Sequence, residues 1–430
     1  MSAVATPKSW PSFATSAPGL ITFLILLEGF KIRRYLPAFE AGIVLLLAIA
    51  IPIIAAEALV FKSYQHPETG LDFSRGSPAA AGRVAVKLLG LYASMALIGL
   101  CYYLIPEYRD ALYKEYWRLL EHLLPAALIL AVPYIWLLDK YLVDKQDANW
   151  QAGMLVLGRI KSVDKVILKN HILGWCVKGF FLPLMFCYLV RNMDHFQTQS
   201  LAGNFWTMMI DRNPYPFYHT AVTLIFTIDL AYVSIGYLLT FKLLNSHIRS
   251  VEPTVLGWAA ALACYHPFWD YIGSKFLHYN NDGYNFDAWL GPHPIFLTAW
   301  GVAILLLLAV YVWATIQFGI RFSNLTHRGI ITNGPYKYCK HPAYVSKNLS
   351  WWLIAVPFIP NGHWLEALQN CLMLAAVNLI YYLRAKTEEA HLGKDKCYQE
   401  YMAYMREHSL YSKIRRMLLP KPVMARTCDP

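Results

Sequence analysis

Residues 40–61 read EAGIVLLLAIAIPIIAAEALVF, an apolar run interrupted by Pro52 and, near its end, by Glu57. The hydrocarbon core of a bilayer is about 30 Å thick, and roughly 20 apolar residues cross it as a helix. The run therefore predicts a transmembrane helix. The composition agrees, because 57% of the 430 residues are hydrophobic and 15% are charged, against roughly 45–50% and about 25% in soluble domains. These values exclude an ordinary water-soluble globular protein.

About ten segments of this kind follow one another along the chain, and two of them, 20–30 and 344–357, are short for a full crossing. The last two segments flank the turn PNGH at 360–363 and predict a helical hairpin. We predict an all-α fold, a polytopic transmembrane bundle of about 9–10 membrane segments. The segments lie near residues 20–30, 40–61, 84–105, 122–143, 172–190, 216–240, 254–272, 294–318, 344–357 and 364–383.

Basic residues outnumber acidic ones by 38 to 27, a formal net charge of +11. In multi-pass membrane proteins such an excess gathers in cytoplasmic loops, so nucleic acid is not an expected partner. The basic loop 144–170 is therefore predicted to be cytoplasmic, and counting spans forward places the basic loop 319–343 and the C-terminus there too. The same count puts Lys31, Arg33 and Arg34 outside, so either one early segment does not span or the rule is broken locally.

Neither metal nor disulfide chemistry is expected. The eight cysteines are scattered without a CxxC pair, and the histidines between 266 and 293 are irregularly spaced. Charged residues within apolar segments mark functional sites by default, although pairing inside the bundle is an equally good explanation. The residues concerned are Glu28, Glu57, Lys87 and Asp229.

Residues 321–344, RFSNLTHRGIITNGPYKYCKHPAY, form a polar and aromatic loop between two apolar segments. Its turns can direct backbone N–H groups at an anion, and its tyrosine rings can attract an organic cation. His341 precedes Pro342, which favours a helix that begins just after the histidine. The candidate ligand contacts in this loop are Gly329, Gly334, Pro335, Tyr336, Tyr338, His341 and Tyr344.

A second polar segment, RAKTEEAHLGKDKCYQEYMAYM at 384–405, follows the hairpin. Arg384 and Glu388 stand four residues apart, on one face of a continuing helix. The carboxylate can accept hydrogen bonds from sugar hydroxyls, and the guanidinium can hold an acceptor carboxylate through two parallel bonds. A solvated helix with an intrahelical ion pair is the alternative, and spacing alone favours it.

The two segments resemble the signature of the isoprenylcysteine carboxyl methyltransferases and their relatives, the phospholipid N-methyltransferases. That signature is GPYRYxRHPxYxG, a helical hairpin, RxxxEExxL and YxxY. The matching residues are Gly334, Pro335, Tyr336, Lys337, Tyr338, Lys340, His341, Pro342 and Tyr344, then Arg384, Glu388, Glu389 and Leu392, then Tyr398 and Tyr401. Ser346 departs from the pattern, which has glycine at that position.

The resemblance covers roughly residues 295–420 and implies an S-adenosylmethionine-dependent methyltransferase with its cofactor on the cytoplasmic side of the last helices. It implies cofactor contacts from Gly334, Pro335, Tyr336, Tyr338, His341, Tyr344, Glu388 and Glu389, with Arg384 and Glu388 as catalytic residues. Residues 291–430 are then the methyltransferase-like membrane domain, and residues 1–290 a transmembrane region of unassigned role that shapes a substrate chamber or a partner surface.

The acceptor is left open by the sequence. A hydrophobic isoprenoid or membrane lipid is expected, and its carboxylate would need no general base, whereas an amine or hydroxyl would need a glutamate or His341. The aromatic stretch 266–294 is either an interfacial belt or a wall of the acceptor's route. Two other functions remain open, an NADPH-dependent sterol or isoprenoid reductase and a non-enzymatic transporter or scaffold. The oligomeric state is not set.

Overall fold

The computed structural model describes residues 13–202, 215–280 and 284–418, and most of them are helical. The only strands in these ranges, β1 (Ser250–Val251) and β2 (Thr326–His327), pair antiparallel. The helices are α1 Phe13–Leu24, α2 Ala38–Ala55, α3 Ala81–Leu104, α4 Lys114–Tyr141, α5 Ala148–Val156, α6 Lys165–Ala202, α8 Tyr215–Leu238, α9 Val255–Leu262, α10 Phe268–Lys275, α11 Phe286–Leu290, α12 Pro294–Phe318, α13 Pro342–Ala355, α14 Trp364–Leu392, α15 Lys396–His408 and α16 Leu410–Leu418.

Six helical segments are long and apolar enough to cross a membrane, which confirms an all-α, multi-pass membrane fold. They are Ala38–Val60, Ala81–Leu104, Ala111–Tyr141, Lys165–Gln199, Pro216–Leu238 and Pro294–Arg321. The predicted segments 20–30 and 344–357 correspond to shorter helices, Phe13–Gly29 and α13. The expected hairpin consists of α13 and α14.

The predicted segment 254–272 is not one continuous helix. It is divided into α9 and α10, with His266 and Pro267 between them. Proline has no N–H to donate and disfavours helix at the residue before it, so the chain bends there. The bend brings Tyr265 and Trp269 toward the last two helices, where Trp269 packs with Tyr344, Tyr381 and other aromatic residues.

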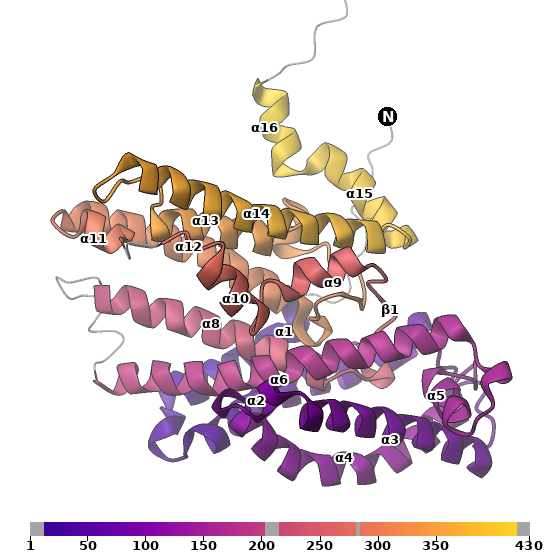
Figure 1. Ribbon diagram of the computed structural model, residues 1–430. Helices are drawn as coiled ribbons and strands as arrows, with labels where there is room; N and C mark the ends of the chain where they lie inside the picture. The colour runs from indigo at the N-terminus through magenta and orange to yellow at the C-terminus, as the bar shows by residue number, and fades with distance from the viewer. Residues whose placement is uncertain (1–12, 203–214, 281–283, 419–430) are drawn as a thin grey trace, which may run out of the picture.

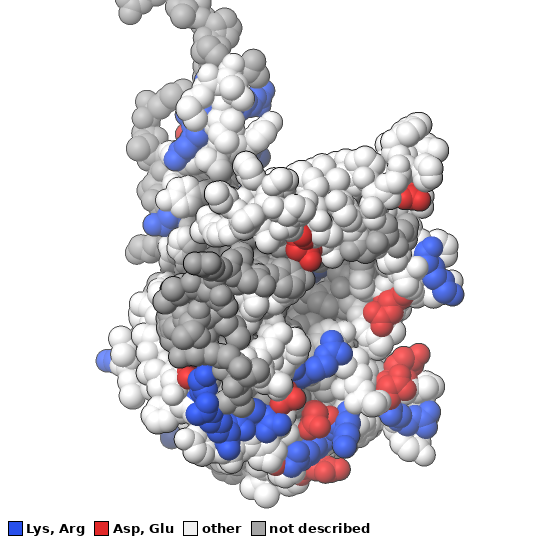
Figure 2. Space-filling view, turned by 90° about the vertical axis from the view of Figure 1, so that its left-hand side faces the viewer, with Lys and Arg blue, Asp and Glu red and all other residues white. Residues whose placement is uncertain are grey.

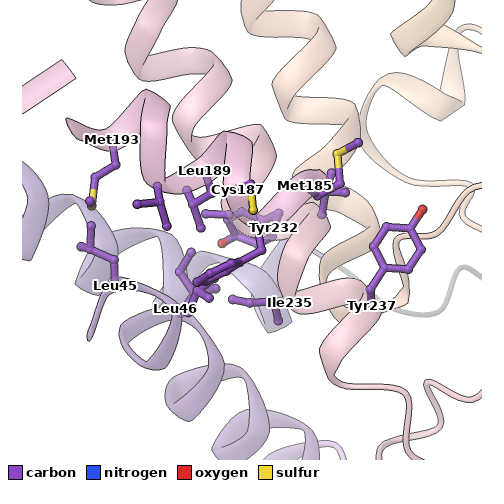
Figure 3. Close-up of a cluster of buried hydrophobic side chains, with 14 of the residues drawn as sticks. Leu45, Leu46, Met185, Cys187, Leu189, Met193, Tyr232, Ile235 and Tyr237 are labelled. Atoms are coloured by element: carbon purple, nitrogen blue, oxygen red, sulfur yellow. The ribbon is translucent and has the colours of Figure 1, made fainter. Parts of the chain in front are cut away.

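The main helices lie roughly side by side, with α12, α13 and α14 along one edge of the bundle and α3 and α4 along the other (Figure 1). Between these edges, α2, α6 and α8 share the largest apolar core, whose buried members include Leu45, Leu189 and Tyr232 (Figure 3). The short helix α5 lies directly against α3. A Cβ at Gly90 would collide with the carbonyl oxygen of Asn149, so only glycine permits this close approach.

The N-terminal basic residues lie away from the side that carries β1 and α15. Arg33 Nε lies 2.6 Å from Asp194 Oδ1, close to the end of α6 that points away from α5 (Figure 1). Lys31 Nζ lies 3.8 Å from Glu28 Oε1. On this side of the bundle, charged side chains of both signs gather over the lower part of the molecule (Figure 2). Lys31 and Arg33 therefore each have a carboxylate nearby at this end of the bundle.

A buried ion pair connects the early helices to the C-terminal region. Arg321 Nη1 lies 2.6 Å from Glu57 Oε1, and Arg321 Nη2 lies 3.1 Å from Glu57 Oε2. The guanidinium also donates to the carbonyl oxygens of Leu244 and Asn245, at 2.9 Å each, and Ser63 donates to the same carboxylate. Both charges are almost fully buried. Of the two explanations for charged residues within apolar segments, pairing inside the bundle therefore applies to Glu57.

Two more of the intramembrane charges have partners within the bundle. Lys87 Nζ lies 3.0 Å from Asp139 Oδ1, and both side chains are buried. Asp229 accepts hydrogen bonds of 2.6 Å from Tyr311 and from Thr315. These contacts satisfy charges that would be costly in hydrocarbon.

We predict that Glu57→Ala strongly destabilises the fold. The substitution leaves Arg321 buried without a counter-charge, which typically costs about 3–5 kcal/mol. Thermal unfolding of the detergent-purified protein measures the loss. Glu115→Ala is the matched control, because Glu115 pairs with Arg118 at 3.9 Å in a much more exposed position, and we expect its midpoint to stay near that of the wild type. Equal midpoints for the two variants would contradict the role of the buried pair.

Candidate active site

A cavity opens among α9, α12, α13, α14 and the loop between α12 and α13. Its empty volume is about 1050 Å³, part of it open to solvent. We call it the main chamber. An adjoining side pocket of about 570 Å³ reaches α15 and includes Arg328, Gly329, Tyr398 and Tyr401. The two cavities share walls and form one continuous site, and the shared residues are Phe318, Ser323, Thr326, Tyr336, Lys340, His341, Glu388 and Leu392.

Two glycines and a proline shape the loop that carries the first motif. Gly329 and Gly334 have φ angles of +123° and +58°, a region that side chains with a Cβ rarely adopt. A Cβ on Gly334 would also come within 2.8 Å of Gln317 Cδ. Pro335 occupies the first turn of the 3-10 helix Gly334–Lys337. This turn buries Tyr336, whose carbonyl oxygen accepts a hydrogen bond of 2.7 Å from Tyr401.

The second half of that motif meets the glutamates at the end of α14. α13 begins at Pro342, so His341 stands at its N-terminus as expected. His341 Nδ1 lies 3.9 Å from Glu388 Oε2, and His341 Nε2 lies 3.2 Å from Glu389 Oε1. Tyr344 donates to Glu388 Oε2 at 3.0 Å, and its ring stacks on that of His341 at a centroid distance of 5.5 Å. His341, Tyr344 and Glu388 therefore face one cavity together.

Glu389 supports this group from behind. It contacts His341 and pairs with Lys340 at 2.6 Å and Lys386 at 3.2 Å, but it does not line either cavity. Burial raises the pKa of Glu389, yet the hydrogen bonds from His341 and Lys340 outweigh this effect and hold its pKa well below the usual value for glutamate. The ionised carboxylate therefore fixes the orientation of the imidazole ring.

Arg384 is buried and surrounded by aromatic rings. Its Cζ lies 5.1 Å from the ring centroid of Tyr344, 5.2 Å from that of Tyr381 and 5.6 Å from that of Tyr265. Arg384 Nη2 donates to Asn324 Oδ1 at 3.1 Å. Within the described residues no carboxylate lies within 4.0 Å of the guanidinium, so the solvated intrahelical pair with Glu388 that spacing favoured is not formed. Cation–π contacts stabilise the buried charge instead.

Asn324 is oriented by two tyrosines. Its Nδ2 contacts Tyr237 Oη at 3.0 Å and Tyr265 Oη at 3.3 Å, which leaves Oδ1 to accept from Arg384. The sequence did not reveal Tyr265 or Asn324 as site residues. Tyr265 lies in a segment that reads only as a membrane span, and Asn324 precedes the motif without belonging to it.

A second cation, Lys347, was also missed. It lines the main chamber from α13, and its Nζ lies 5.1 to 5.9 Å from the ring centroids of Phe226, Tyr311 and Trp351. Asp229 does not line the chamber, but Tyr311 and Thr315, which donate to it, do. Asp229 thus contributes to the chamber through its two hydroxyl partners.

Four of the expected cofactor contacts do not line either cavity: Glu389, described above, and Gly334, Pro335 and Tyr338. Gly334 and Pro335 form the turn that positions Tyr336. Tyr338 is 53% exposed, and its ring faces Lys413. Ser346, where the family pattern has glycine, is buried and donates to the carbonyl oxygen of Pro342 at 2.8 Å, so its hydroxyl is satisfied within its own helix.

The lining fits a ligand with a positive centre and hydrogen-bonding groups. The carboxylate of Glu388 and the aromatic side chains of the lining, among them Tyr336, suit a cation. Within the described residues the buried hydroxyls of Thr326 and Tyr398 have no hydrogen-bond partner, and both line the side pocket. Such hydroxyls are expected to bind a ligand group. The described residues contain no cluster of three or more His, Cys, Asp or Glu able to hold a metal ion.

No described residue of the aromatic stretch 266–294 lines either cavity, but part of the stretch packs against Tyr344 and Tyr381, which do. Trp269, Leu277 and Tyr279 pack with Trp351 and Trp352 of α13 against the buried face of α14. Residues 281–283 of this stretch lie outside the described residues. An apolar wall therefore extends from Tyr344 and Tyr381, beside Arg384, to Trp351 and Trp352 of the hairpin.

The protein is a multi-pass helical bundle, and its last hairpin closes an aromatic, charged chamber. These features are typical of a membrane enzyme that binds a small polar ligand next to an apolar ligand. The comparison with protein families makes this specific. Residues 297–394 match the model of the Isoprenylcysteine carboxyl methyltransferase (ICMT) family, so this part of the chain is an ICMT family domain. No curated protein and no solved structure matches the chain.

The family consists of S-adenosylmethionine-dependent methyltransferases, which confirms the enzyme class and the methyl donor inferred from the motifs. Residues 297–394 are thus a methyltransferase domain within a multi-pass membrane protein. No family match supports the two alternative functions, a sterol or isoprenoid reductase and a transporter or scaffold. The matched range includes the motif of the loop, the hairpin and Arg384 to Leu392, but it ends before Tyr398 and Tyr401 and excludes α9 and Tyr265, which complete the chamber.

We predict that Glu389→Gln destabilises the protein by about 1.5–3 kcal/mol at neutral pH, because it removes charge-assisted hydrogen bonds. The lowered pKa of Glu389 means that its contribution is present above its unfolded value of 4.5 and is lost as the pH falls through its lower folded value. The difference in melting temperature between the wild type and the variant should stay constant from about pH 5.5 to 8 and shrink below about pH 4.

Glu366→Gln is the control for this measurement, because Glu366 is exposed at the other end of the same helix. We expect no pH-dependent difference for it. A difference for Glu389→Gln that is as large at pH 3 as at pH 7 would show that the ionised carboxylate is not the cause.

Proposed function

We propose that the protein transfers a methyl group to a carboxylate on an isoprenylated or similar lipid acceptor, with Arg384 holding the acceptor. The observation that carries this proposal is a buried guanidinium that faces the chamber with no carboxylate of the described chain within 4.0 Å. Family membership implies an isoprenylated substrate and leaves the specific acceptor open.

The surroundings of Arg384 favour an anionic group from outside the chain. A buried charge is costly unless it is paired, and aromatic faces and one amide oxygen compensate it only in part. A carboxylate is the natural partner of the planar guanidinium, which binds it through two parallel hydrogen bonds. Such an acceptor is ionised at neutral pH and needs no general base.

The methyl donor is proposed to bind across the shared wall and the side pocket. When bound, S-adenosylmethionine supplies a methyl group already activated by the positive charge on its sulfur. Glu388 would attract this charge and accept hydrogen bonds from the sugar hydroxyls, with His341 and the Tyr344 hydroxyl positioning its carboxylate. Tyr398 and Thr326 offer hydroxyls to the polar remainder. The residues then act mainly by aligning the reacting groups and excluding water, which can supply several kcal/mol, up to roughly 7–11.

The lipid part of the acceptor is proposed to lie along the aromatic wall formed by Trp269, Trp351 and Trp352. This wall adjoins Tyr344 and Tyr381, so an apolar chain there would present its polar end to Arg384. We further propose that the site faces the cytoplasm, because the basic loop 144–170 includes α5, which lies at the same end of the bundle as β1 (Figure 1). Residues 291–430 would then form the methyltransferase domain, and residues 1–290 would complete the chamber around it.

We predict that the purified protein binds S-adenosylhomocysteine and that Glu388→Ala weakens this binding by at least about tenfold, the scale of one hydrogen bond to a charged group. Tyr344→Phe should weaken it less, because the substitution keeps the ring face and removes only the hydroxyl. Isothermal calorimetry measures both effects. Glu366→Ala at the far end of α14 serves as the control and should bind as the wild type does. Absence of binding by the wild type would end the proposal.

We also predict that Arg384→Lys lowers kcat/KM for an S-farnesylated cysteine derivative with a free carboxylate by about 100-fold, the value of one well-oriented charge-assisted pair. Lysine keeps the charge and loses the planar pair of donors. Affinity for S-adenosylhomocysteine should change by less than about threefold, which shows that the variant is folded.

Arg406→Lys on the exposed surface of α15 is the matched control and should leave kcat/KM unchanged. An undiminished rate on the free acid in Arg384→Lys would exclude Arg384 as the group that holds the acceptor. Transfer to an amine lipid in preference to the acid would replace the carboxylate acceptor.

A further inference from the structure

The last described helix, α16, has an amphipathic surface that no other described part of the chain covers. None of its nine residues is buried. Leu410, Tyr411, Met417 and Leu418 are each more than half exposed, and Ile414 is 42% exposed. At about 3.6 residues per turn, these five side chains fall within an arc of roughly 120°. Exposed apolar stripes of this kind mark an interaction surface.

Basic side chains border this stripe. Lys413 and Arg415 lie on its two edges, and Arg416 points away from it and donates to the carbonyl oxygens of Ser412 and Glu407. α16 has no acidic residue. A helix with an apolar stripe flanked by lysine and arginine is typical of segments that lie in the headgroup region of an anionic membrane.

The length and direction of α16 agree with this placement. A helix of nine residues is marginal by itself in water, so it requires a stabilising surface. Within the described chain its main contact is with α15. Figure 1 shows α16 running across the direction of α14 and away from the bundle. If α14 crosses the bilayer, the axis of α16 therefore runs roughly parallel to the membrane plane.

We propose that α16 is an interfacial helix that binds the anionic lipid surface on the side of the cofactor site. The apolar stripe enters the boundary between headgroups and acyl chains. Arg415 extends to the lipid phosphates from one edge, and Lys413, whose Nζ lies 5.9 Å from the ring centroid of Tyr338, adds positive charge at the other edge.

This attachment also reaches the side pocket, a consequence that rests on the proposed function. The backbone N–H of Leu410 donates to the carbonyl oxygen of Tyr338 at 2.8 Å. In the preceding helix, Tyr398 and Tyr401 line the side pocket, and Tyr401 donates to Tyr336. Lipid binding by α16 would hold α15 in place over the pocket and so favour the methyl donor.

Amide hydrogen exchange of the full chain, one copy per nanodisc, tests the proposal. Nanodiscs of phosphatidylcholine are compared with nanodiscs that also contain phosphatidylglycerol. We expect residues 411–418 to exchange roughly 30-fold more slowly in the anionic nanodiscs, and Lys413→Gln/Arg415→Gln to remove this difference. Lys394→Gln/Lys396→Gln removes the same charge from exposed sites outside α16 and should leave the difference intact.

Equal exchange of α16 in both kinds of nanodisc would overturn the proposal. Protection that persists in Lys413→Gln/Arg415→Gln would also overturn it, because the helix would then be held by the protein. The exchange measurement does not depend on methyltransferase activity. S-adenosylhomocysteine affinity is measured in the same nanodiscs. If α16 is protected but the affinity is the same in both, the lipid contact stands and only its coupling to the donor site is refuted.

Discussion

The C-terminal half depends on one constraint, which is that the charges of its buried arginines must be compensated inside the protein, away from bulk water. Three arginines of this region are nearly inaccessible, and each is compensated differently. Arg321 pairs with Glu57, Arg328 donates to the backbone carbonyl oxygens of Gly236, Leu239, Ser246 and Phe322, and Arg384 lies among aromatic rings. The first two hold the loop after α12 to the rest of the bundle. The third is compensated least, and it is the one that faces the chamber.

Irregular backbone at the edge of a membrane is tolerated where its polar groups are satisfied by protein or line a cavity. The loop between α12 and α13 meets both conditions. Its strand β2 pairs with β1, Arg328 satisfies carbonyl oxygens that helices leave open, and the turn around Gly334 directs Tyr336 inward. The site residues on this loop are therefore held in position by the contacts that the loop makes with the surrounding helices and with β1.

Local patterns predicted the parts of this structure that depend on nearby residues. The apolar runs predicted the six long spans, although about ten segments were expected, and Pro342 predicted the start of α13. The meeting of His341 and Glu388 at one cavity was implied by the family resemblance and not by spacing. Spacing misled where a tertiary contact competes, since Arg384 turns toward Tyr265 and Asn324 and not toward Glu388. Pro267 indicated the break between α9 and α10, but the apolar composition of the segment led to the prediction of one continuous span. Lys347 and Tyr265 acquire their role only when distant helices meet, and no spacing along the chain carries that information.

The short ladder between β1 and β2 fixes how two distant parts of the chain meet at the chamber. It joins residues 250–251 to the loop that precedes the first motif, and the residues that follow β1 supply Glu252, Gly257 and Tyr265 to the chamber from outside the family-matched range. Substitutions at these three positions therefore change the shape of the chamber without altering any residue of the matched domain.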